Sequence, residues 1–130
     1  MLLSKDAILS ATDRNYKDEY VPEWGGTVRV TGLSGTDRDA YEAAMVDAKG
    51  KPAMQRLQNF RTKLVVKCLV NENGERIFDD SDVKELGSKN GAVLDRLFDV
   101  ARELSGMGQD AVADAEKNSE NDRSVNSTSA

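Results

Sequence analysis

The chain has 130 residues, of which 38% are hydrophobic and 32% are charged, and it carries a formal net charge of −5. That length fits a single domain. The acidic balance argues against binding to nucleic acid or to an anionic membrane, and no stretch approaches the roughly 18 consecutive apolar residues of a membrane-spanning helix.

The N-terminal residues predict a short helix rather than a targeting segment. Residues 1–6 lack the basic segment and the long apolar stretch of a signal peptide, and Cys68 has no second cysteine to pair with. Both features lead us to expect a reducing cytoplasm. Ser4 is placed to cap a helix that runs to Ala11, and the polar run 12–19 is interpreted as a linker.

A β-hairpin is predicted next. Two runs that favour strands, Tyr20–Trp24 and Thr27–Thr31, flank a Gly-Gly pair that suits a tight turn. Pro22 lacks an amide proton, so the first strand should lie at a sheet edge. Trp24 fits either a side chain that covers the hairpin or an anchor for a partner, and packing is the more common role.

Two helices are expected after the hairpin. Ser34 can cap the first, with Asp37 reaching back in a shortened capping box, and its apolar spacing continues to Ala48. The second starts with Pro52 in its first turn and continues through an ambiguous run, Leu64–Val70, which also suits a buried strand. The upstream helical spacing favours a helix there.

The next segment predicts a turn and a broken helix. Residues 71–74 form the turn, and an acidic cluster then opens a helix in which Asp82 and Glu85 have capping-box spacing. Gly87 and Gly91 each disfavour a continuous helix, so a kink or break is expected between them.

The strongest helical pattern lies near the end of the chain. Val93–Leu104 carries a broad apolar stripe, and Gly106 and Gly108 end it. Residues 109–130 have the composition of a disordered polar tail. We therefore expect an α+β fold, mainly helical with a small N-terminal hairpin, in one domain at 1–108 followed by the tail.

The composition points away from catalysis. The chain has no histidine, which removes the commonest general base and metal ligand, and Cys68 lies in an apolar stretch that makes it an inert core residue. The segment 69–80 resembles a calcium loop, but Leu69 would occupy its first ligand position and Asp80 its last. We expect no enzyme activity, no cofactor and no metal, and the carboxylates are interpreted as helix caps.

Several stretches resemble the tail assembly chaperones of long-tailed phages and prophages of Gram-positive bacteria. The similarity spans roughly Leu3 to Ser105 and keeps the order and spacing of its motifs. It is carried by residues 21–30 (VPEWGGTVRV), 33–42 (LSGTDRDAYE), 76–83 (RIFDDSDV) and 94–98 (LDRLF).

The resemblance implies a binding role. Proteins of this family bind the long, coiled-coil-prone tape-measure protein, keep it soluble and help tail-tube subunits to polymerise around it. It implies the tape-measure protein as partner, the tail-tube protein as a second candidate, action in the host cytoplasm and absence from the finished virion.

The surface predicted to bind the partner is the part of the Val93–Leu104 stripe that the core leaves uncovered. Its residues would be Leu94, Leu97 and Phe98, alongside Trp24. Self-association into a homo-oligomer through the same face is the alternative. The other functions that the sequence allows are an acidic adaptor or inhibitor of a host protein and a small structural tail or connector subunit.

Overall fold

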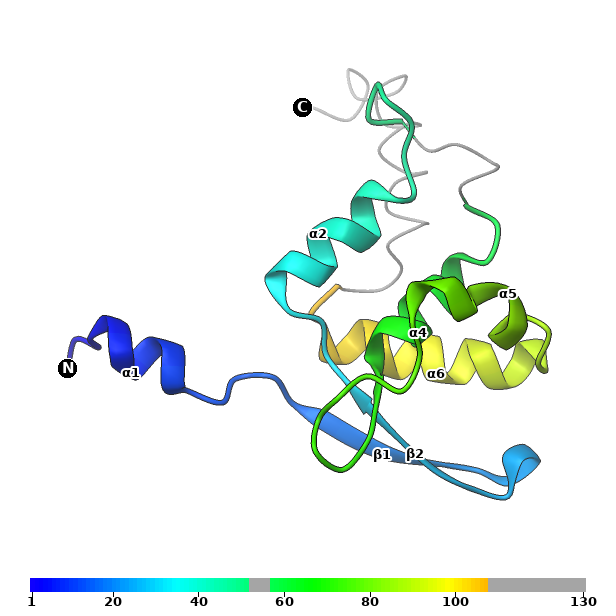
Figure 1. Ribbon diagram of the computed structural model, residues 1–130, viewed down its shortest axis with the longest axis horizontal. Coiled ribbons are helices and arrows are strands. Elements are labelled where there is room, and N and C mark those ends of the chain that lie inside the picture. Colours follow the sequence, from blue (N-terminus) through cyan, green and yellow to red (C-terminus); the bar gives the residue numbers. More distant parts are fainter. Residues whose placement is uncertain (52–56, 108–130) are drawn as a thin grey trace, which may run out of the picture.

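The computed structural model describes residues 1–51 and 57–107 (Figure 1). Within them a three-stranded antiparallel sheet is packed against helices, so the predicted α+β fold with an N-terminal hairpin is confirmed. The predicted helix start at Pro52, the stop at Gly108 and the tail 109–130 lie outside the described residues. In chain order the elements are α1 (Lys5–Ser10), β1 (Tyr16–Val21), η1 (Pro22–Trp24), β2 (Gly26–Thr31), α2 (Gly35–Ala43), α4 (Phe60–Cys68), β3 (Leu69–Val70), η2 (Asp80–Asp82), α5 (Val83–Leu86) and α6 (Gly91–Leu104).

The hairpin is longer than the sequence suggested, and its turn is built differently. Strand β1 begins at Tyr16, so half of the predicted linker belongs to the sheet, where it pairs in register with β2 from Tyr16 opposite Thr31 to Val21 opposite Gly26. The turn is the 3₁₀ segment η1, and Gly25 alone takes a positive φ, of 74°. Pro22 ends β1, which is the edge strand of the order β1-β2-β3, as predicted.

The two helices that follow are shorter than expected. The Ser34 hydroxyl accepts a hydrogen bond from the Asp37 amide at 3.1 Å, which confirms the predicted cap, but α2 ends at Ala43 rather than near Ala48. The ambiguous run is a helix only as far as Cys68. Its last two residues form β3, because they reach the free side of β2 and pair with it there.

The segment between β3 and α6 is made of short turns. Gly74 closes the predicted turn with a φ of 81°. The capping box lies one turn earlier than predicted, between Asp79 and Asp82 instead of between Asp82 and Glu85, because the 3₁₀ helix η2 precedes α5. The expected break follows, since α5 ends before Gly87 and α6 starts at Gly91 with the Asn90 side chain as its cap.

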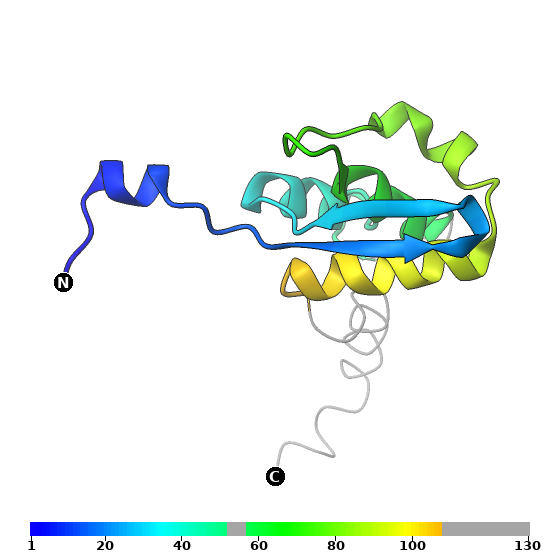
Figure 2. The same ribbon diagram turned by 90° about the horizontal axis from the view of Figure 1, so that it is seen from below.

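The core lies between the sheet and the helices α2, α4 and α6. Figure 2 shows the hairpin in front of α4 and α6, while α1 stands away from the rest in both views. Among the described residues, no helix is long and apolar enough to cross a membrane. The most deeply buried side chains come from every layer: Val21, Val30, Tyr41, Leu64, Val65, Val66, Cys68, Leu69, Val93, Leu97 and Ala101.

Candidate functional site: the open face of the sheet

The residues predicted to contact a partner are mostly core residues. Leu94, Leu97 and Phe98 are 5%, 1% and 3% exposed, and the Phe98 ring packs edge-on against Phe60 with 5.5 Å between ring centroids. Trp24 lies half-buried against the same core. Because α4 and the hairpin both cover α6, its wide apolar stripe packs against two neighbours. A role for these four residues in partner binding stays a prediction.

The uncovered part of the α6 stripe is small. Val100 and Leu104 are partly buried and pack on the margin of the core. The exposed apolar surface lies elsewhere on the molecule.

Eight large apolar or aromatic side chains are well exposed in the described part of the chain, and they gather at two places. Five belong to residues 1–14, here called the N-terminal arm, which precede the sheet. The other three lie on or beside the sheet face that points away from the helices. The eight are Met1, Leu2, Leu3, Ile8, Leu9, Tyr16, Tyr20 and Ile77. Exposed apolar groups that cluster in this way mark interaction sites more often than scattered ones do.

That sheet face, called here the open face, follows from the strand register. Side chains alternate between the two faces of a strand, so the buried Val21 and Val30 place their neighbours on the opposite side. The open face therefore carries Tyr16, Asp18 and Tyr20 from β1, Thr27, Arg29 and Thr31 from β2, and Val70 from β3.

Arg29 lies at the centre of the open face and is held from two sides. Its Nε donates to Asp18 Oδ1 at 2.7 Å and its Nη2 donates to Oδ2 at 3.0 Å. Its guanidinium also stacks 4.1 Å from the centre of the Tyr16 ring. The Asp18 hydrogen bonds raise the pKa of Arg29, and Arg29 lowers the pKa of the Asp18 carboxyl. Tyrosine and arginine are residue types that are enriched at binding hot spots.

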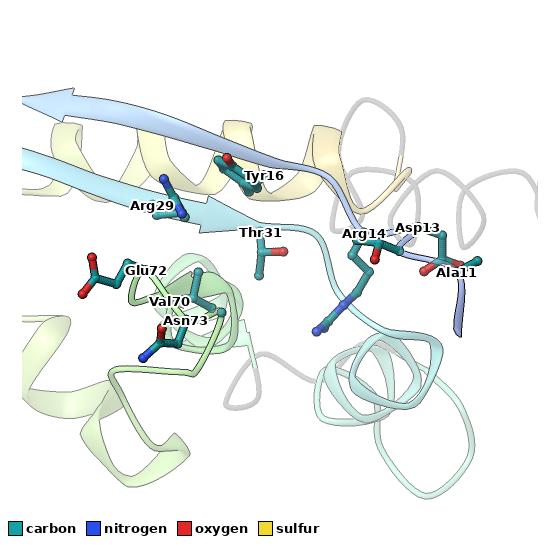
Figure 3. Close-up of a pocket in the computed structure, with 11 residues that line it drawn as sticks. Ala11, Asp13, Arg14, Tyr16, Arg29, Thr31, Val70, Glu72 and Asn73 are labelled. Atoms are coloured by element: carbon teal, nitrogen blue, oxygen red, sulfur yellow. The ribbon is translucent and has the colours of Figure 1, made fainter. Parts of the chain in front are cut away.

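Two shallow hollows adjoin at Arg29. The first, of about 440 Å³, lies between the arm residues 11–14 and the turn 72–74, with Tyr16 and Thr31 in its wall (Figure 3). The second, of about 460 Å³, lies beside Thr27, Asn71 and Ile77. Arg29, Val70 and Glu72 line both, so the two hollows are neighbours on the open face.

The side chains that the sequence offered for catalysis or metal binding are buried or held by neighbouring residues. Cys68 is fully buried, and burial raises the pKa of its thiol to about 12, so the predicted core position is confirmed. Asp80 accepts from Arg76 at 2.8 Å and pairs with Lys67 at 3.2 Å. Within residues 1–51 and 57–107, no group of three His, Cys, Asp or Glu side chains is arranged to hold a metal ion.

The sequence held a signal for the open face that was overlooked. Tyr16 and Tyr20 flank Asp18 at every second position, which is the spacing of one side of a strand. The charged residues between them led to a linker interpretation. Pairing with β2, whose residues are distant in the chain, places this polar segment in the sheet despite its charges.

Comparison with known proteins gives a family and a fold. A family model described as phage tail assembly chaperone matches residues 4–121. Among solved structures, the chain is similar to the tail assembly chaperone of bacteriophage HK97, with a TM-score of 0.55 and 22% sequence identity over 70% of this chain and 85% of that one. At this identity the likeness concerns the fold. None of the curated proteins matches the chain.

Proposed function

The chain belongs to the phage tail assembly chaperone family, and from this premise we propose that it binds the tape-measure protein and keeps it soluble while the tail tube assembles around it. The observation that carries the proposal is that the exposed apolar side chains gather on the arm and the open face. A coiled-coil-prone client has an apolar stripe that must be shielded until it assembles.

The open face suits transient binding of such a client. Its tyrosines and Arg29 combine apolar area with polar groups, so the face stays compatible with water when it is empty. The net charge of −5 disfavours non-specific self-association of the free chaperone and favours basic segments of a partner. We propose the tail-tube protein as a second partner and the host cytoplasm as the place of action, with the chaperone left out of the finished virion.

A rival arrangement uses α6 instead. Leu94, Leu97 and Phe98 could contact a client only if α6 separated from α4 and the sheet, which would expose much of the core. Without that opening, the large apolar side chains of α6 available to a partner are limited to the partly buried Val100 and Leu104. Tyr16 and Tyr20 on the open face are exposed with no such cost, although Thr31 and Val70 on the same face are buried.

The experiment is co-expression with the tape-measure protein of the same phage, followed by purification of the chaperone. We expect the wild-type chain to retain soluble tape-measure protein. The double substitution Tyr20→Ser and Ile77→Ser should lose it, because both side chains are about half or more exposed on the proposed binding side. Val100→Ser on α6 is the matched control and should retain it.

Thermal melting shows whether each variant is folded. If the wild-type chain retains no tape-measure protein, the proposed function is wrong. If Val100→Ser abolishes retention and the open-face variant does not, the client binds α6. Finding the chain in purified virions would favour a structural tail subunit instead.

A further inference from the structure

The helix of the N-terminal arm, α1, buries none of its residues in the described part of the chain. All residues of α1 are exposed, and the large side chains of Leu2, Leu3 and Leu9 are 99%, 60% and 72% exposed. The hydrogen bonds of the helix are local, from the Ala7 amide to the Ser4 hydroxyl at 3.1 Å and from the Ile8 amide to the Ser4 carbonyl at 3.0 Å. The arm is therefore an apolar element without a covering surface in the described part of the chain.

Local sequence favours this helix, but its length does not. Ser4 is the N-cap, and Leu3 and Ile8 occupy the two positions of a hydrophobic staple. Isolated helices shorter than about 12 residues are marginal in water, and α1 has only six residues. Packing against another surface would supply the stability that α1 lacks.

The arm and the open face meet at one site. Ala11, Thr12, Asp13 and Arg14 form one wall of the first hollow, and Thr31 and Val70 lie in its other walls (Figure 3). The chain is anchored at Asn15, whose carbonyl accepts from the Gly32 amide at 3.1 Å. Residues 11–14 span at most about 14 Å when extended, which keeps α1 close to whatever occupies the hollow.

The size and charge of the site indicate its occupant. A six-residue helix is only about 9 Å long, far too small to supply the roughly 800 Å² per partner of a stable dimer interface. Three acidic side chains (Asp13, Asp18, Glu72) and two basic ones (Arg14, Arg29) line the two hollows, on a chain of net charge −5. A partner with an apolar stripe and basic flanks complements that surface.

We propose that the N-terminal arm is a clasp, which closes over an amphipathic, basic-flanked helix of the client seated across the open face. Leu3, Ile8 and Leu9 cover the side of the client helix that faces away from the sheet, and two successive turns of that helix fill the two hollows. The clasp rests on the proposed function for the identity of its client. It adds to that function a second, movable wall of the binding site.

The test uses the full-length chain and fluorescently labelled peptides that tile the tape-measure protein, with binding followed by anisotropy. Ile8→Ser and Leu9→Ser should each weaken the tightest complex by roughly tenfold. Lys5→Gln, on the same helix, is the control and should bind as the wild type does. Because α1 contributes nothing to the core, all three variants should melt like the wild-type chain.

A second readout follows the arm directly. Trypsin should cut the free chain rapidly after the exposed Arg14, and saturating peptide should slow that cut by at least about tenfold, in the wild-type chain but not in Leu9→Ser. Failure of every peptide to bind the wild-type chain would overturn both the clasp and the proposed function.

Two results would overturn the clasp alone. In the first, peptides bind the wild-type chain and the arm variants equally, and Arg14 stays open to trypsin. In the second, light scattering finds a wild-type dimer without peptide that Leu9→Ser dissociates, which would make a second copy the occupant.

Discussion

Arg96 on α6 donates two hydrogen bonds to the carboxylate of Glu23 in the hairpin turn, at 2.9 and 2.7 Å, and so joins residues 73 positions apart in the chain. The pair fixes the far end of the hairpin to the helix beneath it. The Arg96 hydrogen bonds are the main reason why the pKa of Glu23 falls from 4.5 to about 2. The hairpin tip should therefore be sensitive to acid.

We predict that this ion pair makes stability depend on pH between about 4.5 and 2. The folded state holds Glu23 ionised, so its contribution is complete above the unfolded pKa of 4.5 and is lost as pH falls towards 2. Urea unfolding across this range should show that the free energy of unfolding falls less with decreasing pH for Glu23→Gln than for the wild-type chain. Glu103→Gln, at an exposed position on α6, is the control. The prediction would be contradicted if the free energy of unfolding depended on pH equally in Glu23→Gln and in the wild type.

We predict that Gly32→Ala destabilises the fold by about 1–3 kcal/mol. A methyl group there would lie 2.5 Å from the carbonyl oxygen of Leu104, so the exit of the hairpin and the end of α6 would have to move apart. Gly35→Ala, which meets nothing within 4 Å in the first turn of α2, should be neutral or slightly stabilising. Urea midpoints of the two variants measure the contrast, and similar midpoints would argue against the close approach.

We predict that Phe98→Ala costs about 3–5 kcal/mol, because Phe98 is 3% exposed and packs on Phe60. Val100 is partly exposed, and its replacement by alanine should lower the stability of the fold by only about 1 kcal/mol. Differential scanning calorimetry would report both changes. A Phe98→Ala chain that melts like the wild type would argue against a core role for Phe98 and favour the predicted partner contact.

We predict that Cys68 resists alkylation in the folded chain. Burial raises the pKa of its thiol to about 12, and the thiolate is the reactive form. Mass spectrometry after iodoacetamide treatment at pH 8 should find an unmodified native protein and complete labelling in urea. Rapid labelling without urea would show that the region around α4 and β3 opens readily.

We predict that Ca²⁺ leaves the melting temperature unchanged. The carboxylate of Asp82 accepts from the Asp79 amide at 2.8 Å, and Asp80 is held by Arg76 and Lys67. A cation would have to compete with these partners, and the cluster lacks the bidentate glutamate typical of calcium loops. An increase in melting temperature with micromolar Ca²⁺, absent with Na⁺ at the same ionic strength, would contradict this.

Local signals in the sequence predicted the fold where short-range chemistry decides it. Ser4 and Ser34 cap the helices that they were expected to cap, and the glycine-containing turn joins the two strands of the hairpin. These features depend on neighbouring residues alone. The fold class followed because the valine face of the hairpin needs a cover that the hairpin cannot make alone, and the helical patterns supply it.

The features that the sequence did not predict depend on contacts between distant segments. Strand β3 is two residues long and exists because β2 has a free side at Val30. The α6 stripe was wide enough to suggest a binding surface, but its width reflects two neighbours, α4 and the hairpin. That Tyr16 belongs to the sheet follows from its pairing with Thr31, 15 residues away, and this pairing is what defines the open face at its N-terminal end.

Leu69 joins the helical layer to the sheet without a loop. Its amide donates to the Val65 carbonyl as the last hydrogen bond of α4, and its own carbonyl accepts from the Ile77 amide at 3.1 Å. Leu69 also pairs with Val30 of β2, so one residue both caps α4 and takes part in the sheet, and β3 cannot shift relative to α4 without breaking the bond to Val65. If the open face binds a client as proposed, its shape is therefore set by the fold before the client arrives, and adjustment to different client segments is left to the arm.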